Sequence, residues 1–151
     1  MTALIIANII GPALDSVPIA PRGGTPLSTV VADDPHYRQT DARWRSKRVG
    51  ETGESFAATG CTLCSVSMAL ADCGIEMPPD TLNDRLRRAS GFTREGYLRW
   101  DALQDLIAPR AKLMIPTNPD YEVIDRTLNG GHGVMVRIRH RNGLPHWVII
   151  S

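Results

Sequence analysis

The residues of this chain that can act as nucleophiles or bases near neutral pH include three cysteines and four histidines. Cys61 stands out among them, because it follows the small residues Thr59 and Gly60 and opens an apolar stretch, 61–70. A thiol at the start of a helix points at unpaired backbone N–H groups and at the positive end of the helix dipole, which both favour the nucleophilic thiolate. We therefore take Cys61 as the candidate reactive centre.

Cys64 and Cys73 have a plainer interpretation. Free cysteines are among the most buried residues and commonly behave as small hydrophobes, so we expect both in the core. Cys61 and Cys64 also form a C-x-x-C pair, which occurs in redox dithiols and as half of a zinc site. No second C-x-x-C follows, and residues 54–59 make a poor strand for a thioredoxin-like motif. Neither of these alternatives is favoured.

A thiol nucleophile needs a base, usually a histidine held on a strand that is distant in sequence. Four histidines compete for this role. His36 lies where the N-terminal region joins the rest, His132 lies between glycines and His140 borders a turn. Only His146 falls on a predicted interior strand, so it is the candidate base, and the alternative is a surface histidine of a hairpin.

The element that carries Cys61 is predicted to be a buried helix. Three apolar residues repeat at helical spacing on one of its sides: Leu63, Val66 and Leu70. Ser and Thr are the only polar residues between Cys61 and Leu70, and a helix that is apolar almost all round belongs in a core. We expect Gly74 to cap its C-terminus.

Further helices are predicted at about 79–89, 100–107 and 120–128, with a strand at 111–115. Proline in or before the first turn and nearby acids mark the start of the first of these helices. Pro109 ends the second, since proline cannot continue a helix.

A hairpin is predicted at the end of the chain, where alternating apolar runs at 134–139 and 146–150 flank Asn142-Gly143. Asn-Gly favours a two-residue type I′ turn. In that register His146 pairs with Arg139, on the face opposite to an apolar stripe. The stripe contains Val136, Ile138, Trp147 and Ile149. Pro145 is the feature that would instead require a longer loop.

The chain divides by composition into an N-terminal arm, residues 1–35, and one domain, residues 36–151. The arm is rich in proline and glycine, which excludes helix over most of it. It is expected either to pack on its own domain or to anchor the protein to another protein chain. The segment 36–44 is predicted to be irregular and anchored by Tyr37 and Trp44.

Composition limits the classes of function. The chain has 151 residues, 42% of them hydrophobic, which suffices for one core. Its 17 basic and 16 acidic residues give a net charge of +1, without the basic surface typical of nucleic-acid binding. No stretch is long and apolar enough for a membrane span. The apolar start lacks a basic n-region, so no secretory signal is expected.

Six motifs occur in order along residues 37–150. They are Tyr37-x-Gln39-x-Asp41-x-x-Trp44, Gly60-Cys61-x-x-x-Ser65-x-x-Met68-Ala69-Leu70, Gly74, Pro79-x-x-Leu82-Asn83, Gly96-x-x-x-Trp100 and His146-Trp147-Val148. This order resembles the papain-like cysteine peptidases of the bacteriocin-leader-processing type (peptidase family thirty-nine) and their relatives. The resemblance implies an α+β fold, in which a central helix with Cys at its N-terminus packs on a small antiparallel sheet that carries His.

The resemblance also implies roles for three residues. Cys61 would be the nucleophile, His146 the general base, and Gln39 the side chain that stabilises the oxyanion together with the Cys61 backbone N–H. No cofactor or metal is implied. Relatives cut leader peptides, proteins or peptidoglycan stem peptides, so the substrate expected is a peptide or peptidoglycan. An apolar arm suits a virion-associated or exported module, such as part of a phage tail.

Two features depart from the family pattern. The family has an Asp or Asn some fifteen or more residues after the His, whereas this chain ends at Ser151, five residues after His146. We expect a fragment of a longer polypeptide, an incomplete triad or a partner chain that supplies the residue. Arg139 as a neighbour of His146 would disfavour the imidazolium. The alternative function is a catalytically inactive papain-like domain, acting as a structural or peptide-binding component of an assembly.

Overall fold

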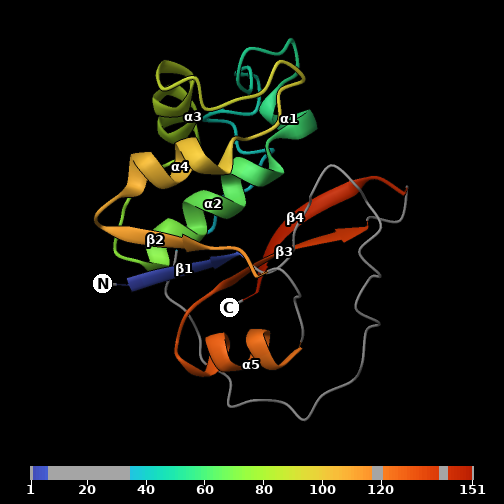
Figure 1. The fold of residues 1–151 in the computed structure, drawn as a ribbon. Coiled ribbons are helices and arrows are strands. Elements are labelled where there is room, and N and C mark those ends of the chain that lie inside the picture. Colours follow the sequence, from blue (N-terminus) through green and yellow to red (C-terminus); the bar gives the residue numbers. More distant parts are fainter. Residues whose placement is uncertain (1, 7–34, 117–120, 140–142, 151) are drawn as a thin grey trace.

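The computed structural model describes residues 2–6, 35–116, 121–139 and 143–150, and its fold is α+β, as predicted (Figure 1). The helices are α1 (Phe56–Thr59), α2 (Cys61–Asp72), α3 (Pro79–Arg88), α4 (Trp100–Ile107) and α5 (Tyr121–Asn129). The strands are β1 (Thr2–Ile6), β2 (Ala111–Met114), β3 (Val134–Arg139) and β4 (Pro145–Ile150).

The strands form one sheet in the order β2-β1-β3-β4. Strand β1 runs parallel to both of its neighbours, and only the β3–β4 pair is antiparallel. The expectation of an antiparallel sheet is therefore correct for the C-terminal hairpin and wrong for the rest. The cause is β1, which comes from the far end of the chain and separates β2 from the hairpin.

Residues 2–6 of the predicted arm are an interior strand of this sheet, with β2 on one side and β3 on the other. A short, continuous apolar run without alternation is typical of a strand buried between parallel neighbours. The chain start therefore belongs to the sheet of the domain that was predicted to begin at residue 36. The rest of the predicted arm, residues 7–34, lies outside the described residues. The prediction that the arm anchors to another chain concerns these residues.

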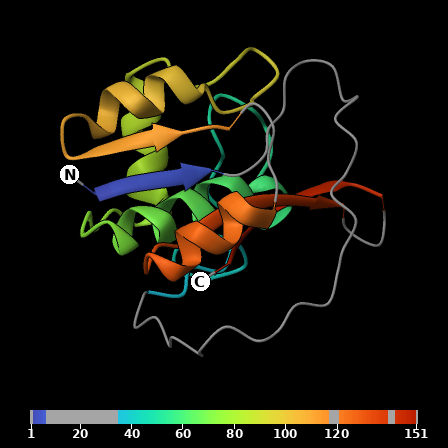
Figure 2. The same cartoon turned by 60° about the horizontal axis from the view of Figure 1, so that its bottom comes forward.

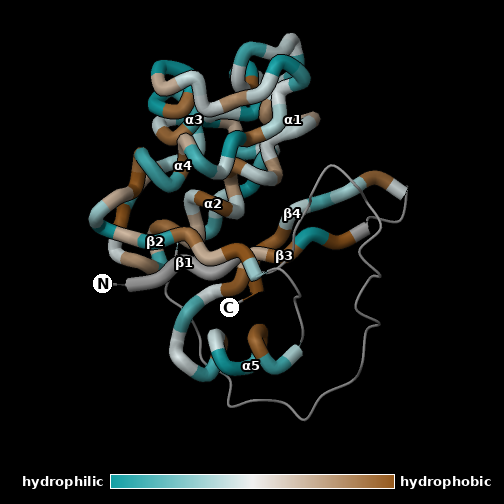
Figure 3. Tube along the Cα trace, in the orientation of Figure 1, coloured by the Kyte–Doolittle hydropathy of each residue, from teal (hydrophilic) through white to brown (hydrophobic). Residues whose placement is uncertain are grey.

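Helix α2 is the central element of the core, as predicted. It packs against α3, β3 and β4, and its fully buried residues include Leu63, Val66 and Leu70. Figures 1 and 2 show α2, α3 and α4 on one side of the sheet and α5 on the other. In Figure 3, the hydrophobic positions concentrate on α2 and on the strands next to it.

Helix α2 ends in the predicted glycine cap. Gly74 has a φ of +70°, a backbone conformation that favours glycine. Its N–H donates to the Ala71 carbonyl at 2.7 Å, and the Ile75 N–H donates to the Leu70 carbonyl at 2.8 Å. These two bonds form a Schellman motif, which satisfies carbonyls at the end of the helix. Within the described part of the chain, no helix is long and apolar enough to cross a membrane.

The hairpin has a different register from the predicted one. His146 pairs with Ile138, and Arg139 pairs with Pro145, so the connecting loop is longer than the two residues Asn142-Gly143. Pro145 explains the difference in register. It is the first residue of β4, an edge strand of the described sheet, and a residue without an N–H is tolerated at that position. His146 is therefore opposite a neutral residue rather than opposite Arg139.

A buried asparagine holds the loop before α1 to helix α3. Asn83 is 3% exposed. Its Oδ1 accepts from the Gly50 N–H at 2.8 Å, and its Nδ2 donates to the Arg48 carbonyl at 3.1 Å. A buried side chain that satisfies one backbone donor and one acceptor fixes the position of that backbone.

We expect Asn83→Ala to destabilise the protein by about 1–3 kcal/mol, because it leaves the buried Gly50 N–H without its partner. Urea unfolding followed by circular dichroism measures the change. Arg88→Ala, at an exposed position of the same helix, is the control and should lie within about 0.5 kcal/mol of the wild type. Equal stability of the two variants would contradict this role of Asn83.

Candidate active site

Cys61 is the first residue of α2, as predicted, and is partly exposed. The sequence did not reveal that the residues before it form the one-turn helix α1. Gly60 joins the two helices in a right-handed conformation, with φ −75° and ψ −1°. A Cβ at Gly60 would lie 2.6 Å from the Phe56 carbonyl oxygen, so glycine is required where the chain turns into Cys61.

The polar segment 38–47 runs beside α1 and bonds to it. The Phe56 N–H donates to the Lys47 carbonyl at 2.9 Å, and the Ala57 N–H donates to the Arg45 carbonyl at 3.0 Å. These carbonyls satisfy N–H groups of the first turn of α1, which have no partner within the helix. Segment 38–47 therefore has a defined position relative to α1.

The same segment is fixed from its other side by the two predicted aromatic anchors. The rings of Tyr37 and Trp44 are both buried and meet edge to face, with centroids 5.7 Å apart. Trp44 Nε1 donates to the Arg38 carbonyl at 2.9 Å, and the Arg43 guanidinium lies 4.4 Å from the Trp44 ring centroid. Hydrogen bonds from Arg43 lower the pKa of the Asp41 carboxyl to about 2, so Asp41 is structural here.

Gln39 lies within this segment and points at α1. Its Nε2 donates to the Ala57 carbonyl oxygen at 2.8 Å. Ala57 is four residues before Cys61, so its carbonyl is the group to which the Cys61 N–H would bond in a continuous helix. Gln39 and the backbone of Cys61 are thus brought within about one helical turn of each other. The Gln39 amide has a second N–H besides the one donated to Ala57.

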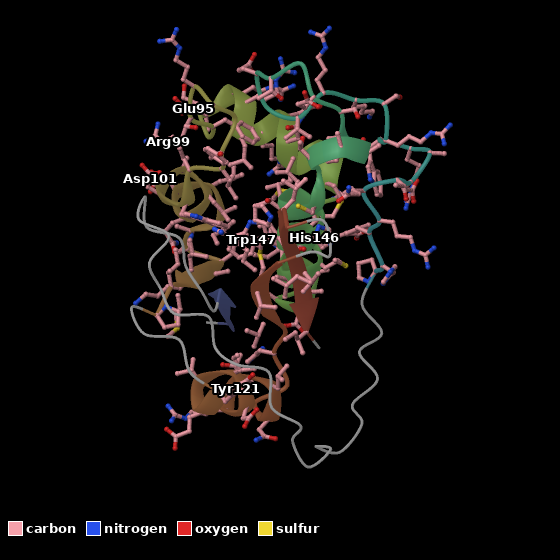
Figure 4. All side chains as sticks on the ribbon, turned by 90° about the vertical axis from the view of Figure 1, so that its right-hand side faces the viewer. Glu95, Arg99, Asp101, Tyr121, His146 and Trp147 are labelled. Carbon is pink, nitrogen blue, oxygen red and sulfur yellow. The ribbon has the colours of Figure 1, made fainter. Side chains whose placement is uncertain are left out.

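His146 is the second residue of β4, the strand that packs directly against α2. Its neighbour Trp147 packs on the core, where it meets Trp100 of α4 at 5.6 Å between ring centroids. Successive side chains of a strand point to opposite faces. His146 therefore lies on the face opposite to Trp147, and Figure 4 shows the two labelled on either side of β4.

This face assignment corrects the predicted apolar stripe. The residues that face α2 and its core are Met135, Trp147 and Ile149, rather than Val136 and Ile138. A shift of one residue in pairing moves one strand's side chains to the other face. In the described sheet β4 is an edge strand, and His146 is its second residue.

The other two cysteines differ in their surroundings. Cys64 is 3% exposed, as predicted. Burial, and then the nearby Cys61 and Asp41, raise the pKa of the Cys64 thiol to about 12. Cys73 is partly exposed at the opposite end of α2. A twelve-residue helix is about 18 Å long, so Cys73 is remote from Cys61.

The remaining described histidines are poorly placed to serve Cys61. His36 is exposed before Tyr37. His132 Nδ1 lies 3.8 Å from Asp72 Oδ2, at the C-terminal end of α2. The same Asp72 oxygen accepts the Gly133 N–H at 2.9 Å, so this group joins α2 to β3. His140 is outside the described residues.

No protein-family model, curated protein or solved structure matches the chain. The family resemblance therefore depends on the order of the sequence motifs. Among the residues that the structure describes, no group of three or more His, Cys, Asp or Glu side chains is arranged to hold a metal ion.

The raised pKa of Cys64 predicts that stability falls at alkaline pH. The unfolded chain loses the Cys64 proton near pH 9, whereas the folded protein retains it to about pH 12. Between these values the folded state binds more protons, so the free energy of unfolding decreases as pH rises. We expect Cys64→Ala to lose stability less steeply than the wild type between about pH 8 and pH 10. Parallel slopes in urea unfolding would contradict this prediction.

Proposed function

We propose that this chain is a papain-like cysteine peptidase that hydrolyses peptide amide bonds, with Cys61 as nucleophile, His146 as general base and Gln39 as oxyanion donor. The observation that carries the proposal is the hydrogen bond from Gln39 to Ala57. It brings a side-chain amide donor, from a residue far away in sequence, to the turn from which Cys61 emerges. A nucleophile beside a preorganised donor is the arrangement that acyl transfer needs.

In the proposed reaction, His146 takes the proton of the Cys61 thiol, and the sulfur attacks the substrate carbonyl carbon. The Cys61 N–H and the free N–H of the Gln39 amide stabilise the negative oxygen of the tetrahedral intermediate. Protonated His146 then gives its proton to the leaving amine, and a thioester remains on Cys61. Water, activated by His146, hydrolyses this thioester and regenerates the thiol.

Peptidoglycan stem peptides are the first substrates that we would test, followed by leader peptides. The motif order suggests both groups, because they are substrates of the family that the chain resembles. We further propose that the domain is a module of a larger assembly, such as a phage tail.

A catalytically inactive domain of the same fold is the second candidate. The observation that favours it is the placement of His146, which shares a face of the hairpin with Ile138 and Val148 rather than with the core residues next to α2. The peptidase proposal requires the imidazole to reach the thiol around the outer edge of β4. An inactive domain, acting as a structural or peptide-binding component, has no such requirement.

Alkylation of Cys61 at graded pH separates the two candidates without knowledge of the substrate. A Cys–His pair keeps the thiolate populated at acid pH, so we expect iodoacetamide to modify Cys61 rapidly below pH 7. His146→Ala should abolish that advantage and leave a rate that rises only near the ordinary thiol pKa. Trypsin leaves all three cysteines in one peptide, residues 49–85, so the fragment ions of that peptide in tandem mass spectrometry measure each site. Cys73, at the other end of α2 from Cys61, is the internal control. A rate at Cys61 that is unchanged in His146→Ala would refute the pair.

Where a cleaved peptide is found, the three residues should differ in the size of their effects. Cys61→Ala should abolish turnover, because no acyl-enzyme forms. His146→Ala should lower kcat by about 10²–10⁴-fold, and Gln39→Ala by about 10²–10³-fold. Cys73→Ala should retain wild-type activity. Full activity in Cys61→Ala would exclude the mechanism.

A further inference from the structure

The first turn of α2 carries two thiols in different states. Cys61 is partly exposed, whereas Cys64 lies in the core behind it. The Cys64 N–H donates to the Gly60 carbonyl at 3.0 Å, which shows that the turn spanning both cysteines is α-helical. Residues three apart on a helix share one side, with Cβ atoms about 5–6 Å apart.

This separation is near that of a disulfide, in which Cβ atoms are about 3.5–4.5 Å apart. Closing the bond requires an approach of about 1–2 Å. The start of α2 can yield by this amount more readily than its middle, because Cys61 follows Gly60 at the junction with α1. Cys73, at the other end of α2, is too far away to pair with either thiol.

We infer that Cys61 and Cys64 form a reversible disulfide when the protein meets hydrogen peroxide, and that this bond protects and silences Cys61. The inference that the disulfide forms depends only on the positions of the two thiols. Its consequence for activity rests on the proposed function, since only a nucleophilic Cys61 is silenced by it. The pair would then be a redox-sensitive site rather than a disulfide oxidoreductase.

The chemistry takes two steps. The exposed Cys61 thiolate attacks one peroxide oxygen, the O–O bond breaks and hydroxide leaves, which gives a sulfenic acid on Cys61. The Cys64 sulfur then attacks the Cys61 sulfur, the S–O bond breaks, and the oxygen leaves as water with the Cys64 proton. In total two thiols are oxidised and one peroxide is reduced to two waters.

The burial of Cys64 sets the order of these steps. Its raised pKa keeps Cys64 protonated, and its burial keeps peroxide away, so oxidation begins at Cys61. Cys64 therefore reacts only with the sulfenic acid of Cys61, which lies on the same turn of the helix. Reduction by a dithiol reverses the bond, whereas a sulfinic acid on Cys61 would be irreversible.

The test oxidises the full chain with about one equivalent of hydrogen peroxide, followed by denaturation, alkylation with N-ethylmaleimide and mass spectrometry. Of the three cysteines, we expect only Cys73 to be alkylated. The disulfide should make the protein lighter by two hydrogen atoms and close an internal loop between Cys61 and Cys64, which fragment ions of the peptide 49–85 reveal. Dithiothreitol should restore all three labels. Cys73→Ala is the matched control and should form the same disulfide.

With a second equivalent of peroxide, Cys64→Ala should instead accumulate sulfinic acid on Cys61, because each of the two oxidation steps consumes one peroxide. Circular dichroism shows whether this variant folds. If this variant does not fold, the peptide map of the wild type still shows whether Cys61 and Cys64 form the disulfide. Sulfinic acid on Cys61 beside an alkylated Cys64 in the wild type would overturn the inference, as would a link through Cys73 or no oxidation at all. If the disulfide forms but no peptidase activity is found, the proposed function is contradicted and this inference is not. Activity without a disulfide would remove this inference alone.

Discussion

The burial of helix α2 is the constraint on which the rest of this structure depends. Leu63, Val66 and Leu70 are fully buried, and each such side chain contributes about 1.5–3 kcal/mol relative to exposure. Neither rotation nor sliding of the helix is possible without exposing some of them. The partial exposure of Cys61 and the burial of Cys64 follow from this, because both residues lie on the first turn of this helix.

The surroundings of Cys61 are fixed mainly by backbone hydrogen bonds rather than by charges. Carbonyls of the segment 38–47 satisfy the first N–H groups of α1, and Gln39 bonds to Ala57 one turn before the thiol. Backbone donors and acceptors must be paired when they are removed from water. An irregular polar segment is thus held in one place next to the candidate nucleophile, whereas a helix would have used its carbonyls internally.

The helices were predictable because their signals are local. Gly74 marks the end of α2, Pro79 lies at the start of α3, and Pro109 follows α4. Strand β1 was not predictable, since its partners β2 and β3 are more than a hundred residues away. Nothing near Thr2–Ile6 distinguishes a sheet strand from an apolar arm. The helix α1 was missed because its four residues are too few to show a helical repeat of apolar residues.

The same contrast explains which half of the site the sequence could reveal. Cys61 begins α2, as its motif predicts, and Gln39 bonds to α1, because a helix start and a nearby backbone contact depend on few residues. The position of His146 depends on the register of a hairpin, in which Asn142-Gly143 and Pro145 favour different loops. A difference of one residue decides which face carries the imidazole. Whether the candidate site can act as a peptidase therefore depends on the strand, whereas the position of the candidate nucleophile depends on the helix.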